Sequence, residues 1–390
     1  MLSPVDPISN FHLPASLSYT RAVLRPLVQQ LARGNALSDE QIALAVDQLA
    51  AEHVAVETKA EFLTALARKG ESAGEIAAFA RELLSRSLQP PLDPETRTRE
   101  ILDVCGTGGD RLNTFNISTT VSFVLAASGV TVAKHGNRAI TSQAGSADVL
   151  EALGVRIDLR PDEAASFLRE HHFAFFFAPS YHPAFKHIGP ARKLCAERGH
   201  RTVFNFLGPL LNPARPSAQL IGVPSIDLCE PMARVLKSLG VRRGMVVCGS
   251  VTRAVPAGKG SVSALAGPDS GPVTGFLDEL STLGETQVAE FYQDRGFMNS
   301  VMLPGGFPLQ PATLTDLAGS DRQTNADIVR RLLRNQERGP KRDAILLNAA
   351  AALFVAGKTK SIVTGWDLAS DLIDSGKAEA KLDEIVRASR

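Results

Sequence analysis

The sequence predicts an α/β protein with a small N-terminal helical domain and a larger domain in which a mixed, mainly parallel sheet is wrapped by helices. Three observations lead to this prediction. The 390 residues are enough for two domains. Helix-capping patterns follow one another near the N-terminus, and short apolar runs alternate with helical stretches in the remainder. We expect the helical domain at residues 18–95, joined by helices from about 185–215, and the α/β domain at 96–390.

Capping boxes define the helical domain. Each box pairs a Ser or Thr with a Gln or Glu three positions later: Ser38 with Gln41, Thr58 with Glu61, and Ser72 with Glu75. In such a box the hydroxyl accepts a backbone N–H of the first turn, and the longer side chain reaches back to the N–H of the cap residue. Apolar residues at helical spacing follow each box. We therefore expect a helix after each box and a linker at Pro90 and Pro91.

Five short apolar runs indicate the strands of the sheet: ILDVC, VTVA, FAFFFA, QLIGV and GMVVCG. Helical stretches separate or follow them, at residues 122–128, 161–172, 227–239, 325–335, 343–356 and 369–375. Strands that alternate with helices at this spacing are typical of parallel or mixed sheets. Residues 250–277 contain mostly Gly, Ser, Pro and Ala without clear periodicity, so we expect a long inserted surface loop there.

The composition is ordinary for a globular protein, with 44% hydrophobic residues, 21% charged residues and a net charge of +1. A net charge near zero argues against nucleic acid or an anionic membrane as partner. The cysteines are far apart and lack zinc-site spacing, so they are expected to be idle thiols in a reducing compartment. The N-terminus lacks the pattern of a secretory signal, and the most apolar span, AILLNAAAALFVAG, is short and contains Asn348. We expect a cytoplasmic protein with no membrane span.

A glycine-rich loop follows the first predicted strand, in the sequence VCGTGGDRLNTFNIST. A strand that ends in a glycine turn before a helix start is typical of an anion site, because exposed N–H groups and the helix dipole point there. Arg111 stands where a dinucleotide fingerprint needs its last Gly, and the GK sequences at Lys259 and Lys358 lack the first Gly of a P-loop. Taken alone, the loop is better interpreted as a tight structural turn.

Two further groups favour a polyphosphate pocket. KHGNR places Lys134, His135 and Asn137 at the end of a second strand, beside the Ser- and Gly-containing sequence TSQAGSAD. The compact charge of Lys134 suits a phosphate. Asp278 and Glu279 are adjacent, and on a loop both could bind Mg²⁺, which prefers one or two carboxylates together with substrate oxygens. Singly, His135 is typical of a structural histidine, and an acid pair is typical of a solvated helix end.

Five motifs resemble, in order and spacing, those of the anthranilate phosphoribosyltransferase family: GTGGD…TFNIST, KHGNR, GSADVLEALGV, RTVFNFLGPLLNPA and LDELSTLGE. The resemblance covers the chain from about residue 20 to SGKA at 375–378. It implies transfer of the 5-phosphoribosyl group of PRPP to the amine of anthranilate, with release of pyrophosphate, in tryptophan biosynthesis. It also implies Mg²⁺ as cofactor and a homodimer.

Carried over residue by residue, the resemblance implies sites for both substrates and for the metal ion. The PRPP-binding residues would be Gly106, Gly109, Asp110, Thr114, Asn116, Ile117, Ser118, Thr119, Lys134, His135, Gly136, Asn137, Arg138, Ser142 and Ser146. The anthranilate-binding residues would be Gly106, His135, Asn137, Arg192, Gly208 and Pro209. The Mg²⁺ ligands would be Ser118, Asp278 and Glu279. Arg192 would pair with the carboxylate of anthranilate, for which a guanidinium fork is suited. No general base is assigned.

The chain departs from the family pattern in three places. Arg111 replaces a Gly common after GTGGD, extra residues lie between Pro190 and Arg201, and a long stretch separates Gly249 from Asp278. None of these departures removes a charged residue that the chemistry requires.

Two other functions stay open. A pyrimidine nucleoside phosphorylase-like enzyme shares this architecture, although KHGNR favours the transferase. A non-catalytic paralogue that binds nucleic acid is disfavoured by the near-zero net charge and by the retained acid pair.

Overall fold

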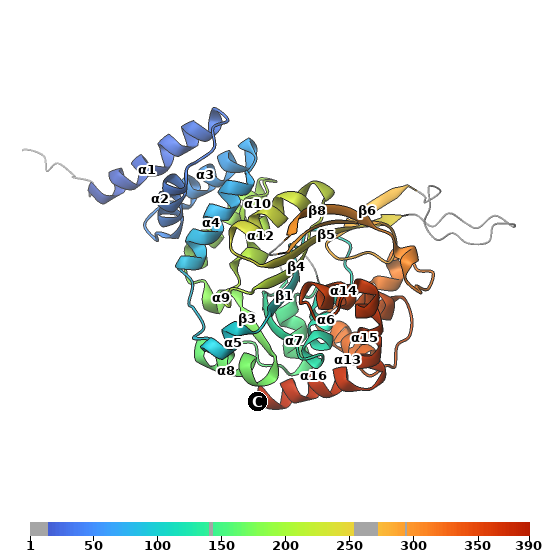
Figure 1. The fold of residues 1–390 in the computed structure, drawn as a ribbon. Helices are drawn as coiled ribbons and strands as arrows, with labels where there is room; N and C mark the ends of the chain where they lie inside the picture. Colours follow the sequence, from blue (N-terminus) through green and yellow to red (C-terminus); the bar gives the residue numbers. More distant parts are fainter. Residues whose placement is uncertain (1–14, 140–142, 253–271, 293–294) are drawn as a thin grey trace, which may run out of the picture. The chain divides into compact units, whose positions relative to one another are not determined.

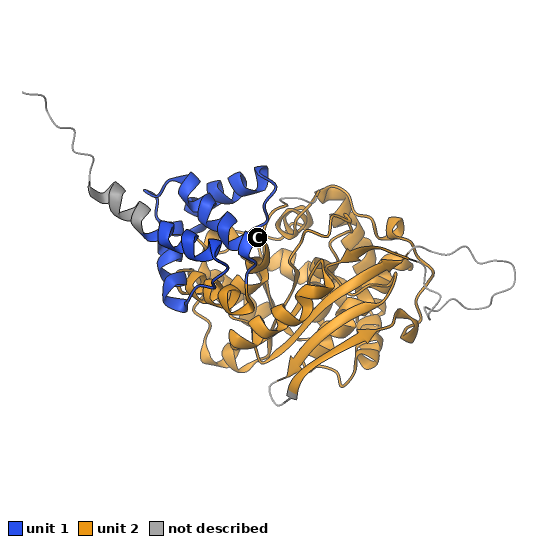
Figure 2. Ribbon diagram, turned by 90° about the horizontal axis from the view of Figure 1, so that it is seen from above, with its two compact units in different colours: residues 1–71, 184–203 blue, residues 72–183, 204–390 orange. Residues whose placement is uncertain are grey.

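The computed structural model describes residues 15–139, 143–252, 272–292 and 295–390. The chain divides into two compact units (Figure 2). Unit 1 comprises Met1–Glu71 and Ala184–Val203, and unit 2 comprises Ser72–Pro183 and Phe204–Arg390. Unit 1 is helical and unit 2 is built on a mixed sheet, which confirms the predicted fold class. The domain boundary expected near residue 95 stays a prediction.

Unit 1 contains these helices in its described part: α1 (Ala15–Ala32), α2 (Asp39–Ala50), α3 (Val56–Lys69) and α10 (Phe185–Glu197). α3 packs against α1 and α10, and α2 also packs against both. The contact faces are apolar, and Ile42 of α2 and Phe62 of α3 are completely buried. Full burial of such side chains contributes about 1.5–3 kcal/mol each, so packing of these faces stabilises the unit more than helix propensity does.

Two of the three predicted capping boxes are confirmed. Ser38 and Ser72 form theirs with both reciprocal hydrogen bonds, at the starts of α2 and α4 (Ala73–Ser85). The box predicted at Thr58 is wrong. A turn precedes α3, and the helix itself begins directly after Ala55. Thr58 therefore already lies in the first helical turn and cannot act as the cap of this helix.

A buried lysine links three parts of unit 1. Lys59 of α3 is 2% exposed, and its Nζ donates to the carbonyl of Ala51 at 2.7 Å and to that of His187 at 3.0 Å. Burial lowers the pKa of this amine. Because each carbonyl belongs to a different helix or helix end, the ammonium joins the end of α2 to α10.

The sheet of unit 2 has eight strands among the described residues: β1 (Ile101–Gly106), β2 (Thr131–Gly136), β3 (Phe173–Phe177), β4 (Ala218–Gly222), β5 (Arg243–Thr252), β6 (Val273–Leu277), β7 (Thr286–Tyr292) and β8 (Arg295–Met302). Their order is β3-β2-β1-β4-β5-β7-β8, and β6 pairs with β5. Strands β1 to β5 pair in parallel, whereas β6, β7 and β8 pair antiparallel. The five apolar runs predicted as strands are confirmed as β1 to β5.

The sequence does not predict β6, β7 and β8. The expectation of a loop is wrong at both ends of 250–277, because β5 continues to Thr252 and pairs antiparallel with β6. In this pairing Ser250 lies opposite Phe276 and Val251 opposite Gly275. Pairing with a neighbouring strand decides strand conformation here, and the local composition gives no sign of it. Residues 253–271 of the expected loop lie outside the described residues.

The remaining helices belong to unit 2: α5 (Pro94–Thr98), α6 (Ile117–Ala127), α7 (Ser146–Leu153), α8 (Pro161–His171), α9 (Ala178–Tyr181), α11 (Phe204–Leu207), α12 (Cys229–Ser238), α13 (Arg322–Leu333), α14 (Pro340–Val355), α15 (Ile362–Asp374) and α16 (Lys377–Ala388). Short 3₁₀ turns lie at Gly208–Leu211, Ile226–Leu228, Pro304–Gly306 and Leu314–Leu317. Each predicted helical stretch overlaps one of these helices, whereas α5, α7, α9 and α16 are not predicted.

Helices wrap the sheet of unit 2 (Figure 1). α6 packs on β1 and β2, α14 packs on β4, and α12 packs on β5 and β7. α14 carries a run of small residues, Ala349–Ala352, that is completely buried and lets α6 and α15 approach closely. No helix in the described part of the chain has the length and apolar character needed to cross a membrane.

Candidate active site

The carboxyl ends of β1, β2, β4 and β5 lie along one edge of the sheet, because these strands pair in parallel. From β1 the chain goes to β2 on one side and later returns to β4 on the other, so the strand order reverses at β1. Ligands of open α/β sheets bind outside the carboxyl edge at such a reversal. The glycine loop follows β1 and KHGNR begins at the end of β2, so the fold brings both to this place.

Asp278 and Glu279 lie in the turn after β6 and cross the ends of neighbouring strands. A Cβ added at Gly106 or at Gly222 would overlap Asp278, and one at Gly249 would collide with the carbonyl oxygen of Glu279. These glycines end β1 and β4 and lie within β5. Only residues without a side chain let the acid pair lie this close to the strand ends.

Three motifs that are far apart in the sequence meet at the acid pair. Asp278 Oδ2 accepts the backbone N–H of Gly108, in the glycine loop, at 2.7 Å. Glu279 accepts the backbone N–H of Ser118, at the start of α6. The hydroxyl of Ser118 lies 3.3 Å from Nζ of Lys134. All three residues expected to bind Mg²⁺ are therefore grouped beside Lys134.

The acid pair is electrostatically suited to a cation. Burial raises the pKa of Asp278 to about 7, with repulsion from Asp110 added, and burial raises the pKa of Glu279 to about 8, with repulsion from Asp278 added. Adjacent, partly buried carboxylates favour a hard divalent cation, since Mg²⁺ prefers oxygen ligands. Within the described ranges, no cluster of three His, Cys, Asp or Glu side chains could hold a metal ion. A Mg²⁺ ion at Ser118, Asp278 and Glu279 would therefore depend on oxygens from a ligand.

Lys134 interacts electrostatically with a second buried charge, Asp103, that the sequence reasoning did not find. Its side chain is 1% exposed, and Nζ donates to the carbonyl of Val104 at 2.8 Å. Asp103, completely buried in β1, accepts from Asn212 Nδ2 at 2.8 Å. Burial lowers the pKa of Lys134 and raises the pKa of Asp103 to about 6. The detectable signal is an acidic residue in the middle of the apolar run ILDVC, because such a charge needs a partner.

His135, Gly208 and Pro209, which the resemblance assigns to the anthranilate site, lie together. His135 Nδ1 is 3.1 Å from the carbonyl oxygen of Gly208, and the ring of His182 meets that of His135 edge-on at 5.3 Å between centroids. The carbonyl of Pro209 accepts from Gln219 Nε2 at 3.0 Å. Burial, with smaller repulsion from His182, lowers the pKa of His135 to about 3. His135 is therefore a neutral ring at ordinary pH and is suited to an aromatic ligand.

Arg192, the residue expected to pair with a carboxylate, lies on α10 of unit 1. It is therefore not among the residues that unit 2 brings together. Its guanidinium lies 5.9 Å from the centroid of the Phe185 ring, and burial lowers its pKa.

At the start of α6, several side chains expected to bind PRPP are buried or hydrogen-bonded within the protein. Asn116 donates from Nδ2 to the carbonyl of Ala144 at 3.2 Å and accepts at Oδ1 from Asn325 at 2.9 Å. Ile117 and Thr119 are buried at 2% and 1% exposure. Any contact of Asn116 or Thr119 with PRPP would therefore use backbone N–H groups, which is typical of anion binding at a helix start. The N–H of Ile117 already donates to the carbonyl of Phe115 at 2.7 Å.

The glycine loop has a left-handed backbone at its centre. Gly109 has φ 90° and Arg111 has φ 60°, while Asp110 Oδ1 accepts the N–H of Leu112 at 3.2 Å. A left-handed φ is strained for Arg111 and relaxed for the glycine that the family pattern has there. Thr114 forms an isolated antiparallel bridge with Ala318, which anchors the end of the loop.

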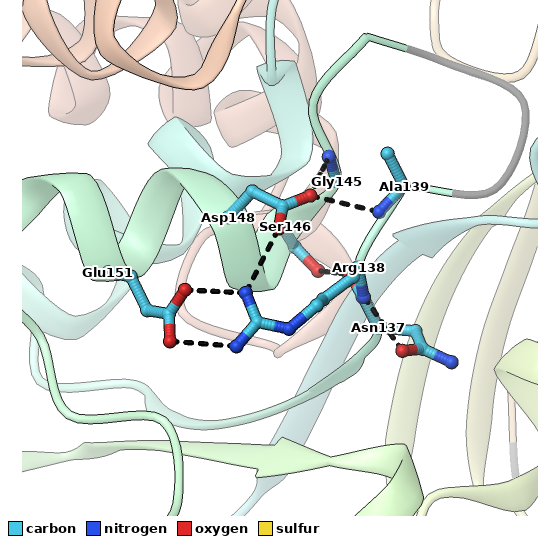
Figure 3. Close-up of polar contacts among 7 residues, drawn as sticks. All are labelled: Asn137, Arg138, Ala139, Gly145, Ser146, Asp148 and Glu151. Atoms are coloured by element: carbon cyan, nitrogen blue, oxygen red, sulfur yellow. Dashed lines mark hydrogen bonds and ion pairs between the residues drawn. The ribbon is translucent and has the colours of Figure 1, made fainter.

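A second loop follows β2 and leads into α7 (Figure 3). The carbonyl of Asn137 accepts from the N–H of Ala147 at 3.3 Å and from the hydroxyl of Ser146 at 3.4 Å. Gly136, at the end of β2, is in close contact with Ser146, since a Cβ there would overlap the hydroxyl. Three of the residues expected to bind PRPP are thus adjacent, whereas Ser142 lies outside the described residues.

Asn348 hydrogen-bonds to Leu280, the residue that follows the acid pair, and this role was not predicted from the sequence. This completely buried side chain on α14 accepts the N–H of Leu280 at 2.9 Å and donates to the carbonyl of the same residue at 3.1 Å. Ser281 Oγ also donates to the carbonyl of Ser250 at 2.6 Å. A lone Asn in an apolar helix is a recognisable signal, because a buried amide has to find partners.

Two family models match the chain. The α/β domain of a glycosyl transferase family matches residues 98–271 and 271–379, and the helical bundle domain of a glycosyl transferase family matches residues 25–87. These matches together span most of both units.

Several curated relatives and solved structures that this chain resembles are named anthranilate phosphoribosyltransferase. The chain is 43% identical over 329 residues to anthranilate phosphoribosyltransferase of Alkaliphilus metalliredigens, covering 84% of this chain and 87% of the relative. It is 41% identical over 379 residues to that of Geobacter sp. strain M21, covering 93% and 98%. The crystal structure of anthranilate phosphoribosyltransferase from Thermus thermophilus matches with 39% identity and a TM-score of 0.78 over 93% of this chain and 99% of that one. The Saccharomyces cerevisiae enzyme in complex with PRPP and Mg matches with 26% identity and a TM-score of 0.78 over 97% and 98%.

Proposed function

Since the chain belongs to the anthranilate phosphoribosyltransferase family, we propose that it transfers the 5-phosphoribosyl group of PRPP to the amine of anthranilate. The products are N-(5-phosphoribosyl)anthranilate and pyrophosphate, and the reaction belongs to tryptophan biosynthesis. The observation that carries this proposal is the meeting of Asp278, Glu279, the glycine loop and Lys134 at one edge of the sheet. This group joins anion donors to a pair of metal-binding carboxylates.

The reaction breaks the bond between C1 of the ribose and the pyrophosphate oxygen. Positive charge develops on the ribose and negative charge on the leaving pyrophosphate. Lys134 and the backbone N–H groups of the glycine loop stabilise the negative charge, which is electrostatic catalysis by groups already in place. Ser118, Asp278 and Glu279 would hold Mg²⁺, which would supply positive charge to stabilise the leaving pyrophosphate. The yeast relative solved with PRPP and Mg supports this role.

The amine of anthranilate is the nucleophile that forms the new bond to C1. The neutral ring of His135 and the Gly208–Pro209 segment offer a contact for the aromatic substrate. Arg192 pairs with its carboxylate. The yeast relative has been solved in complex with 4-fluoroanthranilate, which supports an aromatic site in this family. Because an aromatic amine held near C1 is already a competent nucleophile, positioning is enough and no general base is assigned.

The protein is further inferred to act in the cytoplasm as a homodimer that forms through its helical segment, without nucleic acid or membrane as a partner. The family resemblance supports the dimer, and the net charge of +1 supports the absence of a polyanionic partner. Light scattering on the purified protein measures the oligomeric state directly. A monomer at micromolar concentration would contradict this part of the proposal.

A fluorescence assay tests the proposed reaction. We expect the fluorescence of anthranilate to be lost when protein, PRPP and Mg²⁺ are mixed, and the loss to require both PRPP and the metal ion. A folded protein that shows no turnover with fresh PRPP would overturn the proposal. Phosphorolysis of a pyrimidine nucleoside, or salt-dependent retention on DNA without turnover, would favour one of the two alternatives.

A further inference from the structure

One carboxylate joins the two ends of the loop between β2 and α7. Asp148 Oδ2 accepts the N–H of Ala139 at 2.9 Å and the N–H of Gly145 at 2.9 Å, and these residues lie on opposite sides of the loop (Figure 3). The other oxygen, Oδ1, accepts from Arg138 Nη1 at 3.1 Å. The side chain of Asp148 thus holds both described ends of the loop and also the arginine that precedes it.

Glu151, one turn further along α7, completes the cluster. Its carboxylate accepts from both terminal nitrogens of Arg138, at 2.5 Å from Nη1 and at 2.8 Å from Nη2. The guanidinium also lies 5.6 Å from the centroid of the Phe177 ring at the end of β3. Figure 3 shows the Arg138 fork directed toward these two carboxylates. Bidentate pairs of this kind fix the orientation of the guanidinium plane.

This arrangement disfavours direct contact of Arg138 with a phosphate. Both of its terminal nitrogens already donate to carboxylates, and Asp148 and Glu151 add two negative charges beside it. An approaching phosphate would have to displace them or be repelled by them.

The loop itself is tied to residues expected to bind PRPP. Asn137 contacts Ser146, and the carbonyl of Ala144 accepts from Asn116 at the start of α6. Fixing the ends of the loop therefore fixes these side chains relative to the glycine loop. A displacement of 1 Å in such a group can cost about 100-fold in rate.

We propose that Arg138, Asp148 and Glu151 form a positioning cluster that holds the phosphate loop in its binding geometry, and that Arg138 does not itself bind the phosphate of PRPP. This inference rests on the proposed function and assigns roles within its PRPP site. The cluster borders an open cavity of about 670 Å³ that is also lined by Arg156 and Arg322. Because Arg138 and Glu151 line this open space, the isosteric amide Gln can replace Glu151 without disturbing the core.

The variant Glu151→Gln separates positioning from direct binding. If Arg138 bound phosphate through its charge, removal of the negative charge of Glu151 would strengthen PRPP binding or leave it unchanged. Positioning predicts the opposite, a Kd for PRPP raised about tenfold in calorimetry, with KM for anthranilate within about twofold of wild type. Arg138→Lys, which keeps the charge but loses the bidentate geometry, is expected to bind PRPP as weakly as Arg138→Gln does. The double variant Arg138→Gln/Glu151→Gln is expected to bind PRPP no more weakly than either single variant.

A matched ion pair serves as the control. Arg334 and Glu379 are joined at 2.8 Å, and their side chains are 44% and 36% exposed, against 46% and 35% for Arg138 and Glu151. Glu379→Gln is expected to leave the Kd for PRPP unchanged. An unchanged or lower Kd in Glu151→Gln, or rescue by Arg138→Lys, would overturn the inference.

Hydrogen exchange without ligand distinguishes failure of this inference from failure of the proposed function. We expect Glu151→Gln and Asp148→Asn to accelerate exchange at the Ala139 and Gly145 amides, whereas Glu379→Gln does not. Absence of PRPP binding by the wild-type protein would overturn the proposed function. Unchanged exchange at both amides would overturn the positioning cluster.

Discussion

Buried and partly buried charges determine what the site can do. Asp103 and Lys134 are buried within β1 and β2, and the partly buried Asp278 lies against the ends of β1 and β4 with Glu279 beside it. The environment disfavours the charged form of each, as the lowered pKa of Lys134 and the raised pKa values of the three acids show. Ionisable groups whose pKa values are shifted in this way are characteristic of functional sites, because burial that serves stability alone avoids unpaired charge.

Removal of the acid pair is the first test at the scale of residues. We expect Asp278→Ala/Glu279→Ala to lose most of its turnover while its free energy of unfolding changes little, because these acids serve the metal ion rather than the core. Steady-state kinetics over a range of Mg²⁺ concentrations and urea unfolding measure the two effects. Near wild-type kcat at low Mg²⁺ would contradict the assignment.

The buried histidines predict how stability depends on pH. Burial lowers the pKa of His135 to about 3 and that of His182 to about 4, from 6.5. Between pH 6.5 and about 4 the unfolded chain therefore binds more protons than the folded chain, so this contribution to stability falls as the pH is lowered. The loss amounts to at most about 1.4 kcal/mol per pH unit for each histidine. Asp103, with its pKa raised to about 6, acts in the opposite direction.

Urea unfolding of wild type and His182→Gln between pH 7.5 and 4.5 checks this prediction. The difference between the two proteins isolates His182 from Asp103 and the other titrating groups. We expect a smaller loss of stability toward acid pH in the variant. Equal pH slopes in both proteins would show that His182 does not titrate in this way.

At the scale of elements, α14 and the turn after β6 depend on each other. Asn348 satisfies both backbone groups of Leu280, which otherwise lie buried next to the acid pair. We expect Asn348→Leu to lower the free energy of unfolding by about 1–3 kcal/mol, the usual cost of an unsatisfied buried polar group. We also expect it to raise the Mg²⁺ concentration needed for half-maximal rate, since the acid pair loses its support. Unchanged unfolding and unchanged Mg²⁺ dependence would contradict this role.

The insertion between β5 and β6 is a second test at this scale. Its ends are paired strands, with Thr252 opposite Val273, and residues 253–271 lie outside the described residues. We expect a short Gly/Ser connector in place of residues 254–270 to keep kcat within about tenfold, a change of roughly 1.4 kcal/mol in the barrier. Surface connections tolerate changes in length at little cost, provided that the paired ends are retained. A folded variant without turnover would show that the insertion belongs to the active site.

At the scale of the whole molecule, the net charge is small, and the charges that matter for binding are grouped in one place. The net charge is +1, yet the buried Asp103 and Lys134 and the partly buried acid pair lie at one edge of a single sheet. Selectivity for a phosphorylated substrate therefore depends on this edge and not on a long-range field. The parallel strands make the arrangement possible, because they present the ends of β1, β2, β4 and β5 together.

The sequence alone determined the elements whose signals are local. Apolar runs predicted β1 to β5, and capping boxes predicted the starts of α2 and α4, because the relevant contacts lie within a few residues. Motif order also identified the family. The box at Thr58 shows the limit of this reasoning, since a pattern that fits a cap has no effect once the preceding turn starts the helix earlier.

The tertiary structure alone decided how these elements form a site. Strands β6 to β8 exist because they pair with β5 and with one another, and no period in their own sequence indicates it. Three hydrogen bonds join segments that are distant in the chain. They run from Gly108 to Asp278, from Leu280 to Asn348 and from Asn212 to Asp103. Such contacts depend on the register of the sheet and on where glycines let two backbones meet. A local pattern cannot encode them, because their partners are brought together only when the sheet has formed.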